Sequence, residues 1–357
     1  MILMNKGALK KYLKHFLVLN ILTWLIIGVS IPFAFTGYPK YKYSDSDWDD
    51  FSYEPSYNHT QWNILLDAHS HTLASDGYLT PRQNLLWHIS MGFNAMVLTD
   101  HNTFDNVDEI KQIAREEYND TIKVLTGLEW TTDRIHMNII LPPNVTQAQY
   151  ETLITFKSYT YTPTYEEIQN FIQATHDLGG VATVNHIPWS MDYTTNHPTR
   201  QQLYDWGIDY IEIVNGDTYD NESYYFCLDN GLGMITGTDM HAPEEVYCWT
   251  TLNATAFTEE AIFNEIKARR TGFIFTGIPS PYPIEHPIKP SYIALYPLIQ
   301  IGNLFEDMYA SGKLGALFGT LLGYVYGIFI VTETLLFLLK KLIQVIKKKE
   351  LFKIKKK

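Results

Sequence analysis

The sequence predicts an α/β fold in which short buried strands alternate with helices and curl into a barrel. Apolar runs of strand length recur through the middle of the chain, at 63–67, 94–99, 122–128, 135–141, 180–185, 209–214 and 233–238. Segments with helical spacing follow several of them, at 81–91, 105–118, 164–178, 198–206 and 258–270. Strands that alternate with helices usually pair in parallel, and about seven such units suit a barrel.

The helix expected at 81–91 has the clearest start signal. Thr80 is a favoured N-cap residue, and Pro81 follows it directly. Proline is common at the first helical position, where its missing N–H has no partner to lose. We therefore expect the helix to begin at this pair.

Both ends of the chain carry long apolar segments. Residues 16–35 have no charge and follow four lysines, and within 314–339 the charge is confined to Glu333. An apolar helix of about 20 residues spans a bilayer core. The alternatives are a cleaved signal peptide for the first segment and a buried core helix for the second. Because lysines flank both segments on the side away from the middle, we expect two membrane helices, cytoplasmic termini and an extracytoplasmic middle.

These segments divide the chain into six expected parts. In order they are an N-terminal stub with a membrane anchor, a linker, a catalytic domain, a juxtamembrane segment, a second membrane helix and a lysine-rich cytoplasmic tail. Their bounds are 1–36, 37–62, 63–290, 291–313, 314–339 and 340–357.

The middle of the chain is acidic. Residues 37–300 hold 35 Asp and Glu against 13 Lys and Arg. This balance argues against a nucleic-acid scaffold, so we expect no sequence-specific nucleic-acid binding. It suits a domain that binds cations, although solubility alone would also explain it. Cys227 and Cys248 lack zinc-finger spacing, and they are either a single disulfide or, more usually, two unpaired core residues.

Polar residues that can bind metals follow the apolar runs. Histidines two residues apart on a strand point the same way, as His69 and His71 would. A single histidine at a strand end is more often a hydrogen-bonded structural residue than a ligand. Here six histidines and three carboxylates would meet at one barrel mouth, where their burial is costly unless cations compensate. Glu212 lies in the run at 209–214.

In their order, these motifs resemble those of the PHP (polymerase and histidinol phosphatase) phosphoesterase family. The opening H-x-H motif with its S-D-G turn is matched by DAHSHTLASDG, and the second motif by LTDHNTF. The third is matched by GLEWTT with His136, the last two by VNHIPWS and GTDMHAP, and the strand between those two by YIEIVNG. The similarity covers about 63–280. It implies a distorted (β/α)7 barrel of the TIM-like kind.

The resemblance also implies three metal sites. The first would use His69, His71, Glu129 and Asp239. The second would share Glu129 with His136 and His186, and the third would use Asp76, His101 and His241. Histidine and carboxylate ligands without cysteine suit Zn, Mn or Fe, so we expect three divalent ions. An isoleucine separates His186 from Pro188, where the family more often has a His-Pro pair.

Such a site would hydrolyse phosphate monoesters or diesters with a metal-bridged hydroxide. We expect Asp239 and His241 to assist proton transfer and Arg134 to bind the phosphate. Arg200 and Asn215 are further candidates for substrate contacts. Three aromatic residues could stack on a base or sugar, although packing is the more usual role, and they are Trp130, Trp189 and Tyr193.

The expected substrate is a phosphorylated small molecule or a phosphate-containing polymer or lipid, and the expected location is the bilayer. Two other functions remain open from the sequence. One is metal-dependent hydrolysis of C–N bonds, as in related amidohydrolase barrels. The other is a membrane-anchored, non-catalytic sensor of phosphorylated ligands. An intact set of ligand positions favours turnover over sensing.

Overall fold

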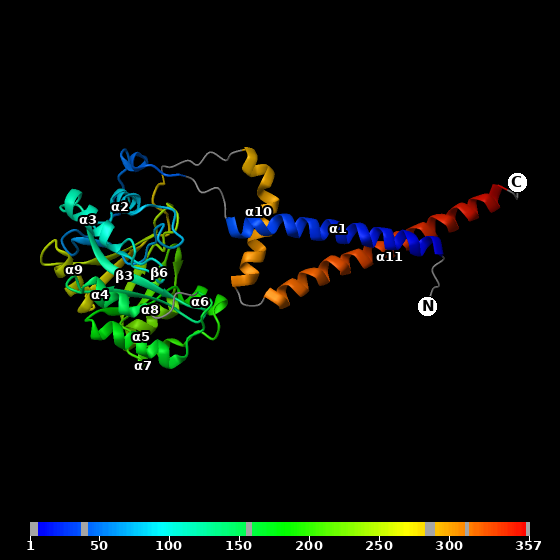
Figure 1. Cartoon of the computed structure of the whole chain (residues 1–357). Coiled ribbons are helices and arrows are strands. Elements are labelled where there is room, and N and C mark those ends of the chain that lie inside the picture. The colour runs from blue at the N-terminus through cyan, green and yellow to red at the C-terminus, as the bar shows by residue number, and fades with distance from the viewer. Residues whose placement is uncertain (1–5, 37–41, 155–158, 283–289, 311–313, 355–357) are drawn as a thin grey trace. The chain divides into compact units, whose positions relative to one another are not determined.

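A computed structural model describes residues 6–36, 42–154, 159–282, 290–310 and 314–354 (Figure 1). The chain divides into two units, residues 40–286 and residues 1–39 with 287–357. The first unit holds the sheet, and the second holds long apolar helices. Parts of the expected N-terminal stub, linker, catalytic domain, juxtamembrane segment and tail lie outside the described residues, at 1–5, 37–41, 155–158, 283–289, 311–313 and 355–357.

The unit at 40–286 is built on a sheet with ten described strands. Their order is β10-β9-β1-β2-β3-β4-β5-β6-β7, and β8 pairs with β6. The pairs β1–β2, β2–β3, β5–β6 and β6–β8 are parallel. The strands are β1 (Ile64–Asp67), β2 (Ala95–Leu98), β3 (Lys123–Thr131), β4 (His136–Leu141), β5 (Val181–Val184), β6 (Tyr210–Asn215), β7 (Thr218–Tyr219), β8 (Gly233–Gly237), β9 (Cys248–Leu252) and β10 (Thr271–Phe275).

The sheet curls until β8 meets the chain that follows β1. Ala68 N donates to Thr236 O at 3.4 Å, and Asp239 N donates to His69 O at 2.9 Å. Strands β1, β2 and β5 are buried along their whole length, as expected for a sheet covered by helices. The α/β class expected from the sequence is therefore confirmed, and the curled sheet is consistent with a TIM-like fold.

Helices surround this sheet (Figure 1). The helix expected at 81–91 begins as its start signal indicated, because Thr80 accepts a hydrogen bond from Gln83 N and Pro81 is the first residue. The helical segments are η1 (Asp45–Trp48), α2 (Pro81–Ser90), α3 (Val107–Glu117), α4 (Gln147–Tyr150), η2 (Glu151–Leu153), α5 (Tyr165–Asp177), α6 (Ile187–Tyr193), α7 (Arg200–Asp205), α8 (Asn221–Asn230) and α9 (Glu259–Lys267).

Strand β4 departs from the expected parallel pattern. It pairs antiparallel with both β3 and β5. Residues 132–135 join β3 to β4, and such a short turn permits an antiparallel hairpin but no helical crossover. As a result His136, the first residue of β4, lies at the end of the sheet where the parallel strands finish. Strands β9 and β10 are also antiparallel additions.

The segment expected as a linker packs against the sheet unit from residue 42 onward. Trp48 is buried, and Tyr53 and Tyr57 pack into the same apolar cluster as Trp87 and Trp249. The reason is composition: its aromatic side chains offer apolar surface that is more stable when buried.

The two cysteines are separate buried thiols. Cys227 Sγ lies 3.8 Å from Gly233 O, and Cys248 Sγ lies 3.4 Å from Gly237 O. Burial raises the pKa of the Cys227 thiol to about 12 and also raises that of Cys248. The disulfide alternative is therefore excluded, and both residues serve the core.

The described residues of the other unit form three helices, α1 (Lys6–Thr36), α10 (Pro290–Ala310) and α11 (Leu314–Ile354). Two stretches, Leu9–Pro32 and Leu314–Lys348, are long and apolar enough to cross a membrane, and little of either is buried within the protein. Most of their large apolar side chains are exposed. Length and composition are thus compatible with membrane anchoring.

Candidate metal centre

The ligands expected from the sequence lie together at one end of the curled sheet. Three follow β1, one follows β2, one lies in β3, one begins β4, one follows β5 and two follow β8. The carboxyl ends of parallel strands meet at one edge, which explains the convergence. We call this end the mouth, and it contains His69, His71, Asp76, His101, Glu129, His136, His186, Asp239 and His241.

Four atoms form a first donor group. His69 Nε2 lies 3.4 Å from Glu129 Oε2 and 3.2 Å from Asp239 Oδ1. His71 Nε2 lies 3.6 Å from the same glutamate oxygen and 3.1 Å from the same aspartate oxygen. Around a tetrahedral ion with bonds of about 2.1 Å, neighbouring ligand atoms are roughly 3.4 Å apart. The spacing of His69, His71 and Asp239 therefore fits one ion, and Glu129 Oε2 approaches the same two imidazoles.

A second donor group uses the other oxygen of Glu129. This Oε1 lies 3.2 Å from His136 Nδ1 and 3.3 Å from His186 Nε2. Asn185 Nδ2 donates to the same oxygen at 3.0 Å. Glu129 thus presents one oxygen to each of two donor groups, as a bridging carboxylate does.

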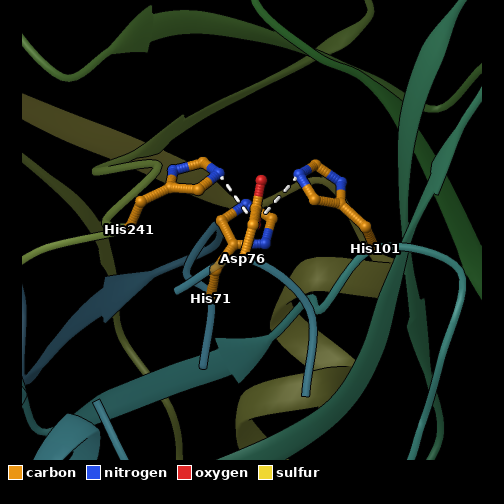
Figure 2. Close-up of side chains that lie close together, drawn as sticks. All are labelled: His71, Asp76, His101 and His241. Atoms are coloured by element: carbon orange, nitrogen blue, oxygen red, sulfur yellow. Dashed lines mark ion pairs between the residues drawn. The ribbon is translucent and has the colours of Figure 1, made fainter. Parts of the chain in front are cut away.

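The third donor group surrounds Asp76. Figure 2 shows this carboxylate between the rings of His101 and His241, in front of His71. Asp76 Oδ1 lies 3.5 Å from His101 Nε2 and 3.2 Å from His241 Nε2. The His71 ring stacks on the other two imidazoles at centroid distances of 4.3 and 4.2 Å. His71 therefore adjoins both the first and the third group.

The burial of the donor atoms indicates that these residues can hold cations. His69, His71 and Glu129 are wholly inaccessible to solvent. Two of the facing atoms, His69 Nε2 and Glu129 Oε2, have no hydrogen bond of acceptable geometry. Buried polar atoms left in this way cost free energy, and a divalent cation between them would remove that cost. The donor sets therefore suit divalent metals.

The histidines differ in charge state. Burial, together with the charges of His101 and His241, lowers the pKa of His71 to about 3. Burial acts in the same direction on His101, but the charge of Glu129 and a hydrogen bond with Asp76 outweigh it and raise its pKa to about 10. The pKa of His241 rises to about 9 because its hydrogen bond to Asp76 and the charge of Asp239 also outweigh burial.

The carboxylates remain ionised at the mouth. Burial alone would raise the pKa of Asp76, but hydrogen bonds from His101 and His241 hold it well below its usual range. The pKa values of Glu129 and Asp239 are also lowered against burial, mainly by the charges of His101 and His69 respectively. The mouth thus keeps the anionic oxygens that a cation needs.

Glu212 was not assigned to the site from the sequence, yet it orients two of the expected ligands. Its Oε1 lies 2.9 Å from His69 Nδ1, and its Oε2 accepts from His186 N at 2.9 Å. A carboxylate on the far nitrogen of a metal-binding histidine fixes the tautomer and ring orientation. A Cβ at Gly237 would lie 2.3 Å from His69 Cβ and 2.4 Å from Glu212 Oε1, so a larger residue there would displace the contact.

Three residues at the mouth have positive φ angles, namely Asn102 at 52°, His186 at 26° and Asp239 at 55°. Non-glycine residues rarely adopt such angles, and strained backbone concentrates at functional sites. Each has a local partner: Asn102 N donates to Glu129 O, Asp239 N to His69 O and His186 N to Glu212 Oε2. His186 and Asp239 carry donor side chains of the mouth, whereas the Asn102 side chain bonds the backbone of Thr131.

The residues expected to bind substrate differ in their surroundings. Arg134 Nε donates to Thr195 O at 3.3 Å, and its guanidinium lies 5.0 Å from the Tyr165 ring centroid. Asn215 Nδ2 donates to Asp239 Oδ2 at 3.2 Å and to Glu212 Oε2 at 3.1 Å, so it positions other site residues.

Arg200 is engaged elsewhere. Its three guanidinium nitrogens bind the acidic and hydroxyl side chains of Asp220, Glu222 and Ser223 at 2.8–3.1 Å. These partners hold the start of α8 and leave the guanidinium without a free nitrogen for a phosphate. The structure therefore speaks against the substrate contact expected for Arg200.

Comparison with known proteins supports the resemblance. The family model described as "PHP domain" matches residues 67–219, so the resemblance expected from the motifs is confirmed. A two-domain protein of Bacteroides vulgatus, described as containing a predicted PHP-like metal-dependent phosphoesterase, is 22% identical, with a TM-score of 0.50. The similarity covers 64% of this chain and 69% of that protein, and it shows the shared fold.

Two curated proteins are similar in sequence. A "5'-3' exoribonuclease" of Haemophilus influenzae is 36% identical over 67 residues, which is 19% of this chain and 23% of that protein. An uncharacterized protein of Methanocaldococcus jannaschii is 25% identical over 192 residues, covering 51% of this chain and 84% of that protein. The chain spans about a quarter of the exoribonuclease that it matches.

Proposed function

We propose that this chain, a metal-dependent hydrolase of PHP type, cleaves phosphate monoesters or diesters with three divalent ions held at the mouth. The observation that carries the proposal is the sharing of Glu129 and His71 among three adjacent donor groups. A phosphoryl group has several anionic oxygens, and adjacent cations can bind them together. An amide offers one carbonyl oxygen and has less use for a third site. We assign the ions to Zn, Mn or Fe.

When bound, such ions would supply a hydroxide nucleophile near neutral pH and neutralise charge on the phosphate oxygens. The protein orients the reactants around them. Asp239 Oδ2 accepts from Asn215, while Oδ1 faces His69 and His71. We assign this carboxylate to accept the proton of the attacking water, because it lies between the first donor group and Asn215.

His241 and Arg134 complete the assignment. The His241 side chain is 36% exposed at the mouth, and we assign it to assist proton transfer to the leaving oxygen. Among the described residues, the two Nη atoms of Arg134 have no hydrogen-bond partner. We assign them to the phosphate oxygens, because a guanidinium binds two such oxygens at once.

The test uses the full chain in detergent, loaded with Mn or Zn. We expect phosphate release from p-nitrophenyl phosphate or its bis-ester, together with bound metal. His69→Ala should abolish phosphate release and lower the metal content by about one ion. His176→Ala is the matched control, because His176 pairs with Asp209 outside the mouth and should leave both unchanged. Turnover of an amide but no phosphate ester would favour the amidohydrolase reaction, and bound metal without any turnover would favour a sensor.

The membrane topology is a separate proposal. We infer that α1 and α11 cross the bilayer with both termini in the cytoplasm, so that the sheet unit is extracytoplasmic and a lipid or surface-polymer phosphate is within reach. A membrane-impermeant maleimide should label Asn58→Cys on intact cells. It should label Lys347→Cys only after the cells are permeabilised. The reverse pattern would overturn the topology but leave the catalytic proposal intact.

A further inference from the structure

The three aromatic residues that the sequence offered for stacking have different environments. Trp130 is 1% exposed and stacks on Phe171 at 4.3 Å, so it belongs to the core. Trp189 and Tyr193 are 47% and 62% exposed, and both lie on α6. The structure thus leaves two of the three rings open to a ligand.

Helix α6 starts directly after His186, and this brings Trp189 to the second donor group. The Trp189 ring centroid lies 5.1 Å from that of His186 and 5.3 Å from that of His136. Tyr193 stacks on Trp189 at 5.1 Å, with 23° between the ring planes. The two rings therefore form a ladder that leads outward from imidazoles at the mouth.

A ligand that covers the exposed rings of Trp189 and Tyr193 would be stabilised by the burial of their apolar surface. Each ring can bury a large apolar area, and a planar partner adds stacking energy of about 1–3 kcal/mol per base. Elsewhere in the sheet unit, large aromatic residues such as Trp87 and Trp249 are wholly buried. Exposed rings also occur away from the mouth, as at Tyr204 and Tyr225, so α6 is distinguished by two exposed rings that stack on each other beside His136 and His186.

We propose that Trp189 and Tyr193 form a specificity site that stacks on a planar ring in the organic part of the substrate. This rests on the proposed phosphoesterase function and narrows its substrate class to phosphate esters that carry an aromatic ring, such as a nucleobase or an aryl group. A phosphoryl group held beside His136 and His186 places the adjoining organic group next to the Trp189 ring.

A bilayer surface is the competing occupant of this face, and the charge distribution disfavours it. Asp192 is exposed on the same short helix, between Met191 and Tyr193. The surrounding residues 37–300 are strongly acidic overall. An anionic lipid surface would repel both, whereas an uncharged aromatic ring would not.

The experiment compares two esters that differ by the ring alone, adenosine 5'-monophosphate and ribose 5-phosphate. In the full chain, Trp189→Ala should lower kcat/KM for the nucleotide about tenfold, which lies within the measured range of base stacking. It should change kcat/KM for ribose 5-phosphate by less than about twofold. Trp189→Phe should restore most of the loss, and Tyr225→Ala, at an exposed tyrosine on α8, is the matched control.

A second readout does not depend on turnover. Adenosine alone should quench the tryptophan fluorescence of the wild type, and the quench should be lost in Trp189→Ala. Equal losses for both esters would mean that Trp189 supports the neighbouring histidines, and no loss for either would mean that it has no role. Both results would overturn the proposal. A defect seen in phospholipid nanodiscs but absent in detergent would instead identify a bilayer contact.

If the wild type releases phosphate from neither ester nor from the p-nitrophenyl substrates, the proposed function fails first. The adenosine titration then decides the ring site by itself.

Discussion

Histidine and carboxylate side chains meet in both units of this protein, but in different ways. Between α1 and α11, His15 Nδ1 lies 2.6 Å from Glu333 Oε1, one nitrogen to one oxygen. At the mouth, Glu129 Oε2 and Asp239 Oδ1 each face the nitrogens of both His69 and His71 at 3.1–3.6 Å. Each also faces a third imidazole, that of His101 at 2.6 Å from Glu129 and that of His241 at 3.6 Å from Asp239. The first arrangement is complete as a hydrogen bond, and the second leaves space between its members.

The comparison teaches how to distinguish a structural pair from a metal ligand set. Two further pairs in the sheet unit, His176–Asp209 at 2.7 Å and His88–Asp67 at 3.0 Å, resemble the helical pair in spacing. A direct hydrogen bond of this length satisfies both groups. Donor atoms that share neighbours at longer, near-tetrahedral distances are better satisfied by an ion between them. We therefore expect metal to matter at the mouth and to be irrelevant between the helices.

Removing the shared carboxylate of Glu129 should have the largest effect on metal binding and phosphate release. Glu129 offers one oxygen to each of two donor groups, so Glu129→Gln should lower the metal content by about two ions. Loss of an orienting partner alone costs about 10–100-fold, and loss of this ligand should lower phosphate release by more than about 100-fold. Metal analysis and initial rates on the same sample measure both.

The matched control is Glu259→Gln. Glu259 is also a largely buried carboxylate, but it pairs with Lys111 and Arg115. It should lower the thermal stability without changing the number of bound ions. If Glu129→Gln kept its full metal content, the bridging role would be wrong.

The next largest effect is expected from the orienting carboxylate. Glu212→Gln keeps the shape of the side chain but removes the charge that holds His69 Nδ1 and His186 N. We expect metal affinity to fall about 10–100-fold, with little change in melting temperature at saturating metal. Metal titrations followed by competition with a chelator measure this. Unchanged affinity would show that Glu212 is a core residue without influence on the ions.

The sequence predicted the positions of the donors better than their surroundings. The expected ligands follow strands, and strand ends in an α/β fold must converge, so their placement could be inferred from local patterns. Glu212 lies within a buried strand and contributes through partners 143 and 26 residues away. Nothing in the YIEIVNG pattern distinguishes such a residue from an ordinary strand carboxylate. A usable signal is that Glu212 stands in an apolar strand with no Lys or Arg close to it in the sequence.

Long-range pairing also explains what the sequence could not predict. The sequence predicted that Arg200 binds the phosphate, but acidic residues at the start of α8 bind its guanidinium instead. The direction of β4 depends on the length of one turn. The packing of residues 42–62 depends on one tryptophan and two tyrosines of that segment, which join a buried cluster. These features come from tertiary contacts, which local periodicity does not contain.

The pH dependence sharpens the comparison. In the metal-free protein the raised pKa values of His101 and His241, about 10 and about 9, mean that both carry protons at neutral pH. Metal binding requires neutral imidazoles and displaces these protons, so affinity should rise about tenfold per pH unit for each proton released. Titrations between pH 6.5 and 8.5 in buffers of different ionisation enthalpy would count the protons.

The stability of the metal-free protein should move in the opposite direction. Both folded-state pKa values lie above the unfolded value of about 6.5, so the stabilisation is complete below pH 6.5 and is lost as pH rises towards 9 and 10. The melting temperature without metal should therefore fall from pH 6.5 to 8.5, and the gain on adding metal should widen. A gain that shrinks with pH would contradict the assignment of these two imidazoles as ligands.

The smallest effect is expected in the helical unit, where the His–Glu pair needs no ion. A second contact, Tyr326 OH to Asn20 Oδ1 at 2.8 Å, joins the same helices. If α1 and α11 cross the bilayer as proposed, His15→Leu leaves the Glu333 carboxyl without its partner in apolar surroundings, and it should destabilise the helix pair more than Glu333→Leu does. The double variant should recover part of the loss, with a coupling free energy of about 0.6–1.7 kcal/mol, the range measured for polar contacts between membrane helices.

SDS unfolding of the wild type, the two single variants and the double variant measures this coupling. Metal analysis should find the same metal content in all four proteins, because the pair at 2.6 Å has no space for an ion. Loss of metal in either single variant would show that spacing alone does not separate the two kinds of site.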